Sequence, residues 1–421
     1  MFFNYTLSET GRKARQDAID FIKSIDRQYL LDMHADKIKF PKELLSEAGK
    51  KNLLGPRNPV AVGGRGLSWV DYQGIIEEFG ALAYEVACVY GVGPDLVCEA
   101  LVKHGNSDQV ERFVKPILKG DMFAAECLTE PRGGSDFFGA TCTVEDKGGY
   151  YVLNGQKRFI VGGEGADIFM VYAKTDPDPK ANPHKSISAF IVERKAGVET
   201  KYQYNLMGCK GGGTARLLFK DVKIPKENLI GKWNGAYDIF NTMMVPERLS
   251  TGMMGIGTAR TAVEVATKYT MTRKQFGQII RRFQAVSFKV ADAVRLVETA
   301  RSLCHTTARA VDSGLIDMNE TRRLVSQAKK FSTEAAQEAS RLAMQVCGGI
   351  GYTTVYPIER IVRDLALASI WTGTNEVMNL IAGAEWYKKF EKYQKDGTYM
   401  GMRNFEDDAD DAFAEGEKIF E

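Results

Sequence analysis

The spacing of apolar residues changes twice along this chain, and these two changes constrain its fold more than any other feature. Up to about residue 120, apolar positions recur with a period near 3.6, which predicts helices. From about 122 to 232 the period is two, which predicts strands. Long amphipathic segments then return from about 234 to 390. The clearest candidate segments are the strands Tyr150–Leu153, Ile168–Tyr172, Ser188–Val192 and Ala215–Phe219 and the helices Ala259–Met271, Ala285–Gly314 and Asn319–Cys347.

This order predicts an α+β protein with a helical domain at 1–121, an antiparallel β domain at 122–233 and a second helical domain at 234–390. A Rossmann unit is not expected, because no helix alternates with the strands. The remainder, 391–421, is polar and ends in an acidic run, so we expect it to be disordered or a solvated helix.

Composition excludes several classes of protein. The net charge of +2 gives no reason to expect binding to nucleic acid or to a membrane surface. No apolar run approaches the ~20 residues of a spanning helix, and the N-terminus has neither signal nor transit character. The seven cysteines and four histidines stand singly, without ligand spacing. We therefore expect a cytoplasmic protein with reduced thiols and no metal site.

One loop has the character of a ligand-binding segment. In Cys127–Asp136, Pro131 favours a turn, two glycines allow close approach of the backbone, and Thr129 and Ser135 offer hydroxyls. Asn154–Gly155 then predicts a turn that leads into an apolar strand, as in a hairpin beside this loop. Such a loop can place main-chain groups against a flat polar ring system; the alternative is an ordinary glycine-rich surface loop.

A predicted apolar helix at 84–102 contains residues that helices normally avoid. Gly91, Gly93 and Pro94 lie inside it, which indicates a kink or a place where another segment packs on bare backbone. Asp95 is unusual in such apolar company. It either caps a helix after Pro94 or faces a pocket.

Five motifs in this order resemble those of the acyl-CoA dehydrogenase family of FAD enzymes. They are Cys127–Asp136, Asn154–Val161, Thr272–Gly277 with Phe283–Ala285, Gln345–Tyr352 with Arg363–Asp364, and Ile370–Glu376. The resemblance covers roughly residues 5 to 390. It implies a C-terminal four-helix bundle, bound FAD, an acyl-CoA substrate, a homotetramer, and an electron-transfer flavoprotein as the electron acceptor.

The resemblance also implies roles for individual residues. Those expected to bind FAD are Leu128, Thr129, Gly134, Ser135, Phe159, Ile160, Val161, Arg273, Gln275, Phe276, Phe283, Gln284, Gln345, Val346, Gly348, Gly349, Thr372, Thr374 and Glu376. Within this set, the residues from Arg273 to Gln284 match positions that reach the FAD of a neighbouring subunit. Those expected at the substrate are Ser135, Arg248, Trp371, Thr372, Gly373 and Asp95.

Two positions depart from the family pattern. Many members carry their catalytic Glu where this chain has Thr372, which cannot remove a proton at neutral pH. The long-chain and isovaleryl branch places its Glu at the position of Glu247 instead, and Glu247 is therefore the expected base. Without the family, Glu247 reads as a helix N-terminal carboxylate after Pro246. Val161 stands where a hydroxyl usually reaches flavin N5, and valine cannot donate a hydrogen bond.

The resemblance implies that Glu247 removes the C2 proton of an acyl-CoA while a hydride leaves C3 for the flavin. The Thr372 backbone N–H is expected to bind the thioester oxygen. Three alternatives stay open: the reverse reaction of an enoyl-CoA reductase, a base role for Asp95 on a cyclic or unsaturated acyl-CoA, and a non-catalytic FAD-binding subunit paired with an active paralogue.

Overall fold

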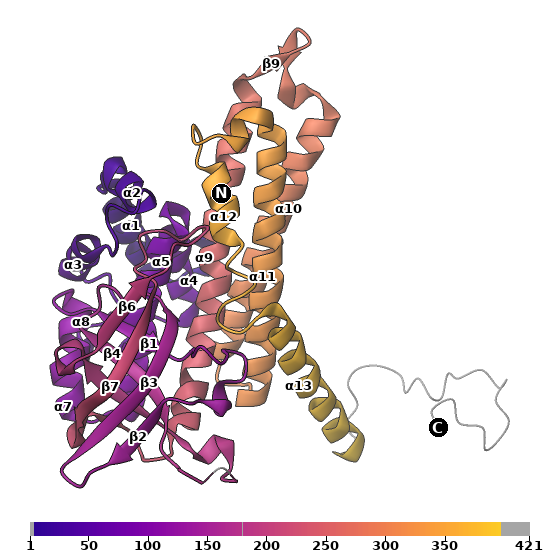
Figure 1. Cartoon of the computed structure of the whole chain (residues 1–421). Helices are drawn as coiled ribbons and strands as arrows, with labels where there is room; N and C mark the ends of the chain where they lie inside the picture. The colour runs from indigo at the N-terminus through magenta and orange to yellow at the C-terminus, as the bar shows by residue number, and fades with distance from the viewer. Residues whose placement is uncertain (1–3, 179, 397–421) are drawn as a thin grey trace, which may run out of the picture.

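The computed structural model describes residues 4–178 and 180–396, which form a helical layer, a β layer and a second helical layer (Figure 1). The first layer contains α1 (Glu9–Lys23), α2 (Arg27–His34), α3 (Lys42–Lys50), α4 (Trp69–Leu82), α5 (Tyr84–Gly91), the π-helix η3 (Val92–Val97), α6 (Cys98–His104), α7 (Ser107–Gln109), the π-helix η4 (Val110–Val114) and α8 (Lys115–Lys119). Serine caps begin two of these helices, because Ser8 accepts the Gly11 N–H and Ser68 accepts the Asp71 N–H.

The β layer is one mainly antiparallel sheet, in the order β6-β7-β3-β2-β4-β5-β8, with β1 beside β4. Its strands are β1 (Ala124–Cys127), β2 (Thr143–Asp146), β3 (Tyr150–Ile160), β4 (Ile168–Lys174), β5 (Ile187–Glu193), β6 (Glu199–Gln203), β7 (Ala215–Pro225) and β8 (Leu229–Ile230). Two pairings, β1 with β4 and β2 with β4, are parallel.

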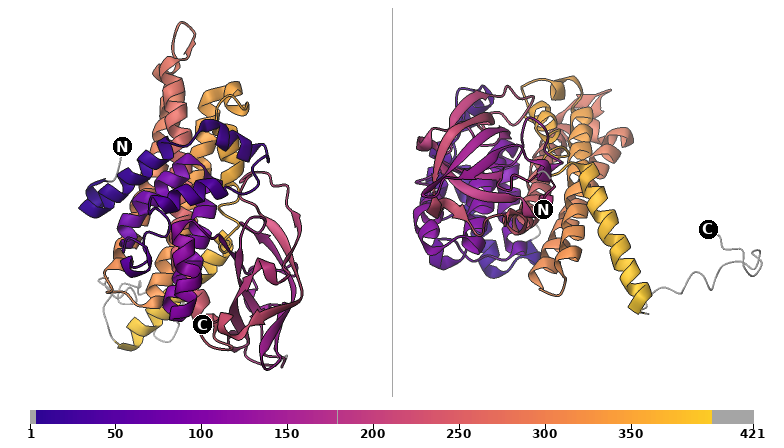
Figure 2. Two further views of the ribbon diagram at one scale, coloured as in Figure 1. Left: turned by 90° about the vertical axis from the view of Figure 1, so that its left-hand side faces the viewer. Right: turned by 60° about the horizontal axis from the view of Figure 1, so that its bottom comes forward.

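Both faces of strand β4 are buried, which explains its unbroken apolar sequence. Ile168, Met170 and Tyr172 pack with the helices, while Phe169 and Val171 belong to the core that the sheet forms with itself. The sheet therefore presents one face to the helical layers, and the left view of Figure 2 shows it to one side of the N-terminal helices.

The C-terminal layer is built on three long helices, α9 (Ala236–Thr272), α10 (Gln284–Asp312) and α11 (Met318–Cys347), followed by the 3-10 turn η10 (Gly348–Tyr352), α12 (Ile358–Leu365) and α13 (Asn375–Asp396). A small hairpin of β9 (Lys274–Gln275) and β10 (Gln278–Ile279) joins α9 to α10 at the far tip of the bundle (Figure 1). Helix α13 packs on α11 and then diverges from the body. The predicted helical, β, helical order is confirmed. The domain limits at 121, 233 and 390 stay predictions, and residues 397–421 of the tail lie outside the described residues.

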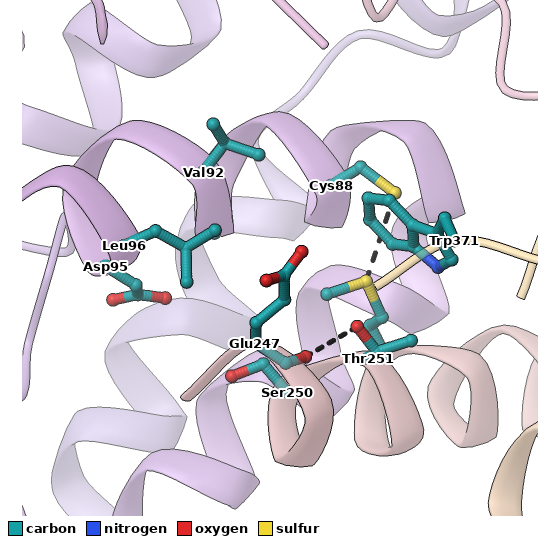
Figure 3. Close-up of a pocket in the computed structure, with 10 residues that line it drawn as sticks. Cys88, Val92, Asp95, Leu96, Glu247, Ser250, Thr251 and Trp371 are labelled. Atoms are coloured by element: carbon teal, nitrogen blue, oxygen red, sulfur yellow. Dashed lines mark hydrogen bonds between the residues drawn. The ribbon is translucent and has the colours of Figure 1, made fainter. Parts of the chain in front are cut away.

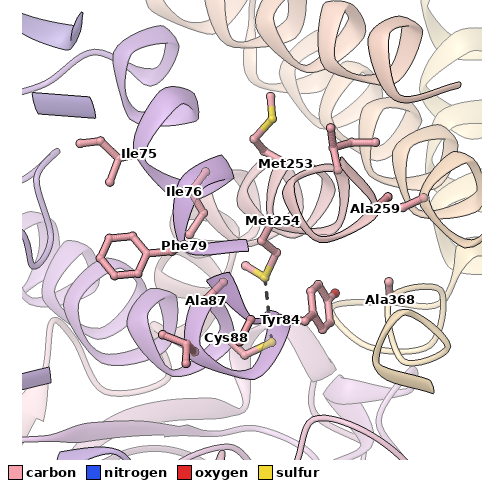
Figure 4. Packing of buried hydrophobic residues seen from close by; sticks show 14 of the residues in the cluster. Ile75, Ile76, Phe79, Tyr84, Ala87, Cys88, Met253, Met254, Ala259 and Ala368 are labelled. Carbon is pink, nitrogen blue, oxygen red and sulfur yellow. Dashed lines mark hydrogen bonds between the residues drawn. The ribbon is translucent and has the colours of Figure 1, made fainter. Parts of the chain in front are cut away.

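Helix α9 packs against α4 and α5 to form the core between the two helical layers (Figure 4). The contact is close because small residues face each other. A Cβ on Gly80 would lie 2.2 Å from the Met254 carbonyl oxygen, and a Cβ on Gly257 would lie 2.0 Å from the Glu77 carbonyl oxygen. The backbones of α4 and α9 thus hold each other in a fixed register, which also fixes the direction of the α9 side chains.

Two local expectations are wrong. Helix α9 does not begin after Pro246; it begins ten residues earlier and runs through the proline, so Glu247 lies inside the helix and not in its first turn. Asn154–Gly155 is not a turn between strands. It lies inside the 11-residue strand β3, where the register with β7 shifts. Gly155 has φ +138° and lies against Cys142, whose Sγ would be 2.5 Å from an added Cβ, so the glycine is needed for a bulge.

The irregular helix at 84–102 has a structural reason. Residues Val92–Val97 form a π-helix between α5 and α6, and Gly93 lies where strand β1 crosses it. An added Cβ on Gly93 would lie 3.0 Å from the Ala124 carbonyl oxygen. The prediction that another segment packs on bare backbone here is confirmed. Asp95 is not a helix cap, because it lies within the π-helix and its carboxylate accepts a hydrogen bond from the Tyr72 hydroxyl.

Candidate active site

A small cavity lies between the η3 segment of the first layer and helix α9 of the last (Figure 3). Its walls are mostly apolar, with four polar side chains among them. The lining residues are Cys88, Gly91, Val92, Asp95, Leu96, Glu247, Ser250, Thr251, Met254 and Trp371. A mostly apolar cavity with a few converging polar groups is the usual form of a small-molecule site.

Glu247 reaches into this cavity from the middle of α9 (Figure 3). Burial raises the pKa of its carboxyl to about 7, while the positive charges of Arg248 and Lys329 act in the opposite direction. A carboxylate with a pKa near neutrality can accept a proton more readily than one in water, and it is still ionised in part at pH 7. The sequence-predicted base therefore lies in the cavity with suitable proton affinity.

Lys329 is a functional candidate that the sequence did not reveal. Its side chain is fully buried in α11, and its Nζ donates 2.9 Å hydrogen bonds to the Gly373 carbonyl oxygen and to Asn375 Oδ1. Burial lowers its pKa to about 8. A lysine inside a long amphipathic helix has no distinguishing pattern, and its partners lie more than forty positions away, so sequence reasoning could not single it out.

The turn that Lys329 holds contains Trp371, Thr372 and Gly373. Thr372 has φ +55°, a left-handed conformation that costs about 1 kcal/mol or more for a residue that is not glycine, and Gly373 has φ +88°. Trp371 Nε1 donates to the Tyr84 hydroxyl at 3.1 Å. Within the described residues the buried Thr372 hydroxyl has no hydrogen-bond partner. The turn is thus held in an uncommon shape at the wall of the cavity.

Arg248 follows Glu247 in α9 but is held on another side of the helix. It is buried, and its Nη1 donates to Ser326 Oγ at 3.2 Å. Burial lowers its pKa to about 10, and the charge of Glu247 opposes that shift. In the described part of the chain its Nε has no partner.

A second carboxyl group that the sequence did not reveal lies near Glu247. Glu126 is in strand β1, on the face that carries Ala124 toward the helices. Burial raises the pKa of Glu126 well above its ordinary value, and the charge of Glu247 raises it further. The two acids therefore disfavour each other's ionisation. Its position just before the predicted Cys127–Asp136 loop was the only available signal.

The predicted cofactor loop is anchored to strand β3. Glu130 forms a 2.9 Å buried ion pair with Lys157 and accepts hydrogen bonds from Thr141 and Cys142. Lys157 Nζ also donates to the Leu128 carbonyl oxygen at 3.0 Å. These contacts fix the loop and leave its predicted ligand groups accessible, since Thr129 and Gly134 are half-buried and Ser135 is exposed.

The end of β3 lies beside this loop, as predicted. The Arg158 N–H donates to the Thr129 carbonyl oxygen at 2.8 Å. Phe159 then has φ +56° and is half exposed, with its ring 4.7 Å from that of Tyr204, whereas Ile160 is buried and Val161 is partly buried. Two separate sequence motifs thus form one surface of backbone groups, hydroxyls and an aromatic ring.

The remaining predicted cofactor residues lie elsewhere in this chain. Arg273, Gln275 and Phe276 belong to the hairpin at the tip of the bundle, where Phe276 is 92% exposed, and Phe283 and Gln284 begin α10. Gln345, Val346, Gly348 and Gly349 lie where α11 ends and η10 begins, and Thr374 and Glu376 lie at the start of α13. The hairpin set does not line the cavity of its own chain.

Within residues 4–178 and 180–396, no helix is both long and apolar enough to cross a membrane. The same residues contain no cluster of three His, Cys, Asp or Glu side chains arranged to hold a metal ion.

Comparison with known proteins agrees with this architecture. The sequence matches the acyl-CoA dehydrogenase N-terminal domain over residues 8–121, the middle domain over 125–222 and the C-terminal domain over 234–386. It is 35% identical over 384 residues to the caffeyl-CoA reductase-Etf complex subunit CarC of Acetobacterium woodii, covering 91% of this chain and 99% of that protein.

Two further matches extend the agreement. Mitochondrial isovaleryl-CoA dehydrogenase of Solanum tuberosum is 32% identical, with 85% of this chain and 86% of that protein covered. The structure of butyryl-CoA dehydrogenase from Megasphaera elsdenii has a TM-score of 0.85 at 29% identity, covering 90% of this chain and 99% of that one. The chain belongs to the acyl-CoA dehydrogenase family. It is therefore an enzyme of the oxidoreductase class.

Proposed function

We propose that this enzyme is an FAD-dependent acyl-CoA dehydrogenase that uses Glu247 as its base. The observation that carries the proposal is the position of Glu247 inside the cavity, with a pKa raised to about 7, while Thr372 occupies the usual position of the family's catalytic Glu. This arrangement supports the proposal that the enzyme resembles the long-chain and isovaleryl branch.

The α-proton of an acyl-CoA thioester is weakly acidic, so Glu247 needs help at the thioester oxygen. The backbone N–H of Thr372 is the candidate donor, because it lies in the turn at the cavity wall that Lys329 fixes. A single preorganised donor of this kind contributes about 3–4 kcal/mol to a transition state. The side chain at this position can therefore change without loss of the backbone donor.

The exposed surface formed by the Cys127–Asp136 loop and the end of β3 has groups that fit FAD. Its half-buried hydroxyl at Thr129, exposed hydroxyl at Ser135 and half-exposed ring at Phe159 suit a flat, polar ring system. Bound FAD would accept the hydride from C3, which carries both electrons that leave the acyl group, while Glu247 takes the C2 proton. Val161 lacks a hydroxyl, so flavin N5 receives no side-chain hydrogen bond from this residue.

We further propose a homotetramer in which the hairpin residues Arg273–Gln284 complete the cofactor site of a neighbouring subunit. The support is their exposure: Phe276 is 92% exposed at the tip of the bundle, and Phe288, in the helix α10 that follows, is 60% exposed. Exposed aromatic rings at an extended tip are typical of a protein interface. An electron-transfer flavoprotein is the proposed electron acceptor, because the Acetobacterium relative is named as a subunit of a reductase-Etf complex.

The deciding experiment is anaerobic bleaching of the FAD-bound enzyme by a panel of acyl-CoAs. Glu247→Gln should abolish bleaching while FAD stays bound. Wild-type turnover in Glu247→Gln would refute the assignment of the base. Return of the oxidised-flavin absorbance when reduced enzyme is mixed with enoyl-CoAs would favour the reductase, and no response to any member of the panel would favour the non-catalytic subunit.

Asp95 is the base in a second candidate function, in which the substrate is a cyclic or unsaturated acyl-CoA. The observation in its favour is that Asp95 lines the same cavity, with a pKa that burial raises to about 7. Asp95→Asn distinguishes the two functions, because it should abolish turnover only if this carboxylate removes the proton.

A further inference from the structure

The cavity has a polar end that the reaction at Glu247 does not use. Figure 3 shows Glu247 between two groups, with Trp371 on one side and Asp95 on the other. Trp371 belongs to the same turn as Thr372, the proposed contact for the thioester oxygen. An acyl group that passes Glu247 from this turn therefore has its far end at Asp95.

Asp95 is 4% exposed, and in the described protein only one of its two carboxyl oxygens has a hydrogen-bond partner. Its Oδ2 accepts a hydrogen bond from the Tyr72 hydroxyl, which is fully buried in α4. Its Oδ1 is buried and has no hydrogen-bond partner among the described residues. A buried acceptor without a partner costs about 1–3 kcal/mol, so a group that could satisfy it would be bound selectively.

Ser250 provides a second polar group at this end. It is also 4% exposed and lies one helical turn beyond Glu247 in α9. Its hydroxyl lies near Tyr72 and acts to lower the pKa of that residue. Within the described chain, however, the Ser250 hydroxyl forms no hydrogen bond of good geometry. The walls around Asp95 and Ser250 are Val92, Leu96 and Met254, which offer no competing polar group.

We infer that Asp95 and Ser250 form a subsite for a hydroxyl group at the far end of the acyl chain. This inference rests on the proposed function. A hydroxyl donates one hydrogen bond, to Asp95 Oδ1, and accepts another, from Ser250 Oγ, so it satisfies both groups at once. A methyl group leaves both unpaired, and a carboxylate is repelled by Asp95.

Other charges near Asp95 do not change this choice. Arg57, the nearest cation that affects its pKa, is already paired with Glu99 at 2.8 Å. Glu99 itself also contacts Lys103 at 2.5 Å. The cavity end therefore has no free cation for an anionic ligand. The substrate class is an acyl-CoA that ends in an aliphatic hydroxyl or in a phenol.

The test uses the FAD-bound enzyme and matched pairs of acyl-CoAs that differ only at the far end. One arm compares ω-hydroxyacyl-CoAs with the corresponding ω-methyl compounds over a series of chain lengths. The other compares para-hydroxyphenylpropanoyl-CoA with phenylpropanoyl-CoA. We expect kcat/KM for the best hydroxylated member to exceed that of its partner by about 10- to 100-fold. Spectral titration of the flavin with the matched enoyl-CoAs measures the same preference as binding.

Three variants complete the test. Asp95→Leu should reverse the preference, and Ser250→Ala should reduce it, whereas Asp95→Asn should keep most of it because an amide oxygen also accepts. Equal use of both members in every pair, a preference for an ω-ammonium group, or a hydroxyl preference that survives Asp95→Leu would overturn the inference.

Different results would refute the hydroxyl subsite and the base role of Glu247. Loss of all turnover in Asp95→Asn, with FAD content unchanged, would make Asp95 a base and overturn the subsite. Wild-type turnover in Glu247→Gln would instead refute the proposed function, while a hydroxyl preference in the binding titration would still support the subsite.

Discussion

Lys329→Met removes the buried cation that holds the turn around Thr372. The change deletes two hydrogen bonds of 2.9 Å, to the Gly373 carbonyl oxygen and to Asn375 Oδ1. Hydrogen bonds from a charged donor contribute about 1.5–3 kcal/mol each to folding stability. Burial of the apolar methionine side chain offsets about 1.5–3 kcal/mol of this loss. We therefore expect the free energy of unfolding to fall by about 2 kcal/mol, which leaves a folded enzyme.

Catalysis should be affected more strongly than stability. If the released turn moves the Thr372 N–H away from the thioester oxygen, kcat should fall by about 100- to 1000-fold. The positive charge of Lys329 also lowers the pKa of Glu247, so its removal should raise that pKa and move the acid limb of the pH–rate profile to higher pH.

Stopped-flow reduction of the flavin across a pH series measures both effects, and FAD content and thermal unfolding show whether the fold is intact. Lys330→Met is the matched control: it removes the neighbouring cation, whose Nζ contacts Glu334 at 2.6 Å, and should change neither quantity. An unchanged kcat together with an unchanged acid limb in Lys329→Met would refute the positioning role.

Three other outcomes are expected. The kcat/KM of the wild-type enzyme should fall as the pH drops below about 7, because Glu247 must be ionised to accept a proton; a kcat/KM that stays constant through this range would show that Glu247 is not the base. Glu130→Ala should cost about 3–5 kcal/mol by leaving Lys157 buried and unpaired, and purified protein should carry less FAD; full FAD occupancy would show that the loop does not need this ion pair. Phe276→Asp should give a smaller particle by light scattering, and an unchanged mass would exclude the hairpin from the subunit interface.

Much of the fold could be predicted because the spacing of apolar residues differs between helices and strands. The change from period 3.6 to period two marked the helical and β layers, and the predicted strand Ile168–Tyr172 lies within β4. Local rules failed where tertiary contacts overrode them. Pro246 lies inside α9, where the packed helix tolerates a lost hydrogen bond, and Asn154–Gly155 forms a bulge because Cys142 packs against it.

The residues of the candidate site also include some that could be predicted from the sequence and some that could not. Glu247 could be predicted because the motif Ile370–Glu376 has Thr372 where many family members carry the catalytic Glu. The base therefore had to be another carboxylate. Lys329, Glu126 and Ser250 could not be found, since each is a single polar residue whose importance comes from neighbours distant in sequence. Burial and unsatisfied polar atoms are properties of the folded chain alone.

The π-helix at Val92–Val97 has a consequence for how such enzymes diverge. A turn of this kind contains one residue more than an α-turn, so deleting a single residue from it can return the segment to α-helical winding and change which of its side chains face the cavity. Asp95 would then no longer face bound substrate. Insertions and deletions in this short segment could therefore exchange one set of accepted acyl groups for another while every side chain of the reacting centre stayed the same.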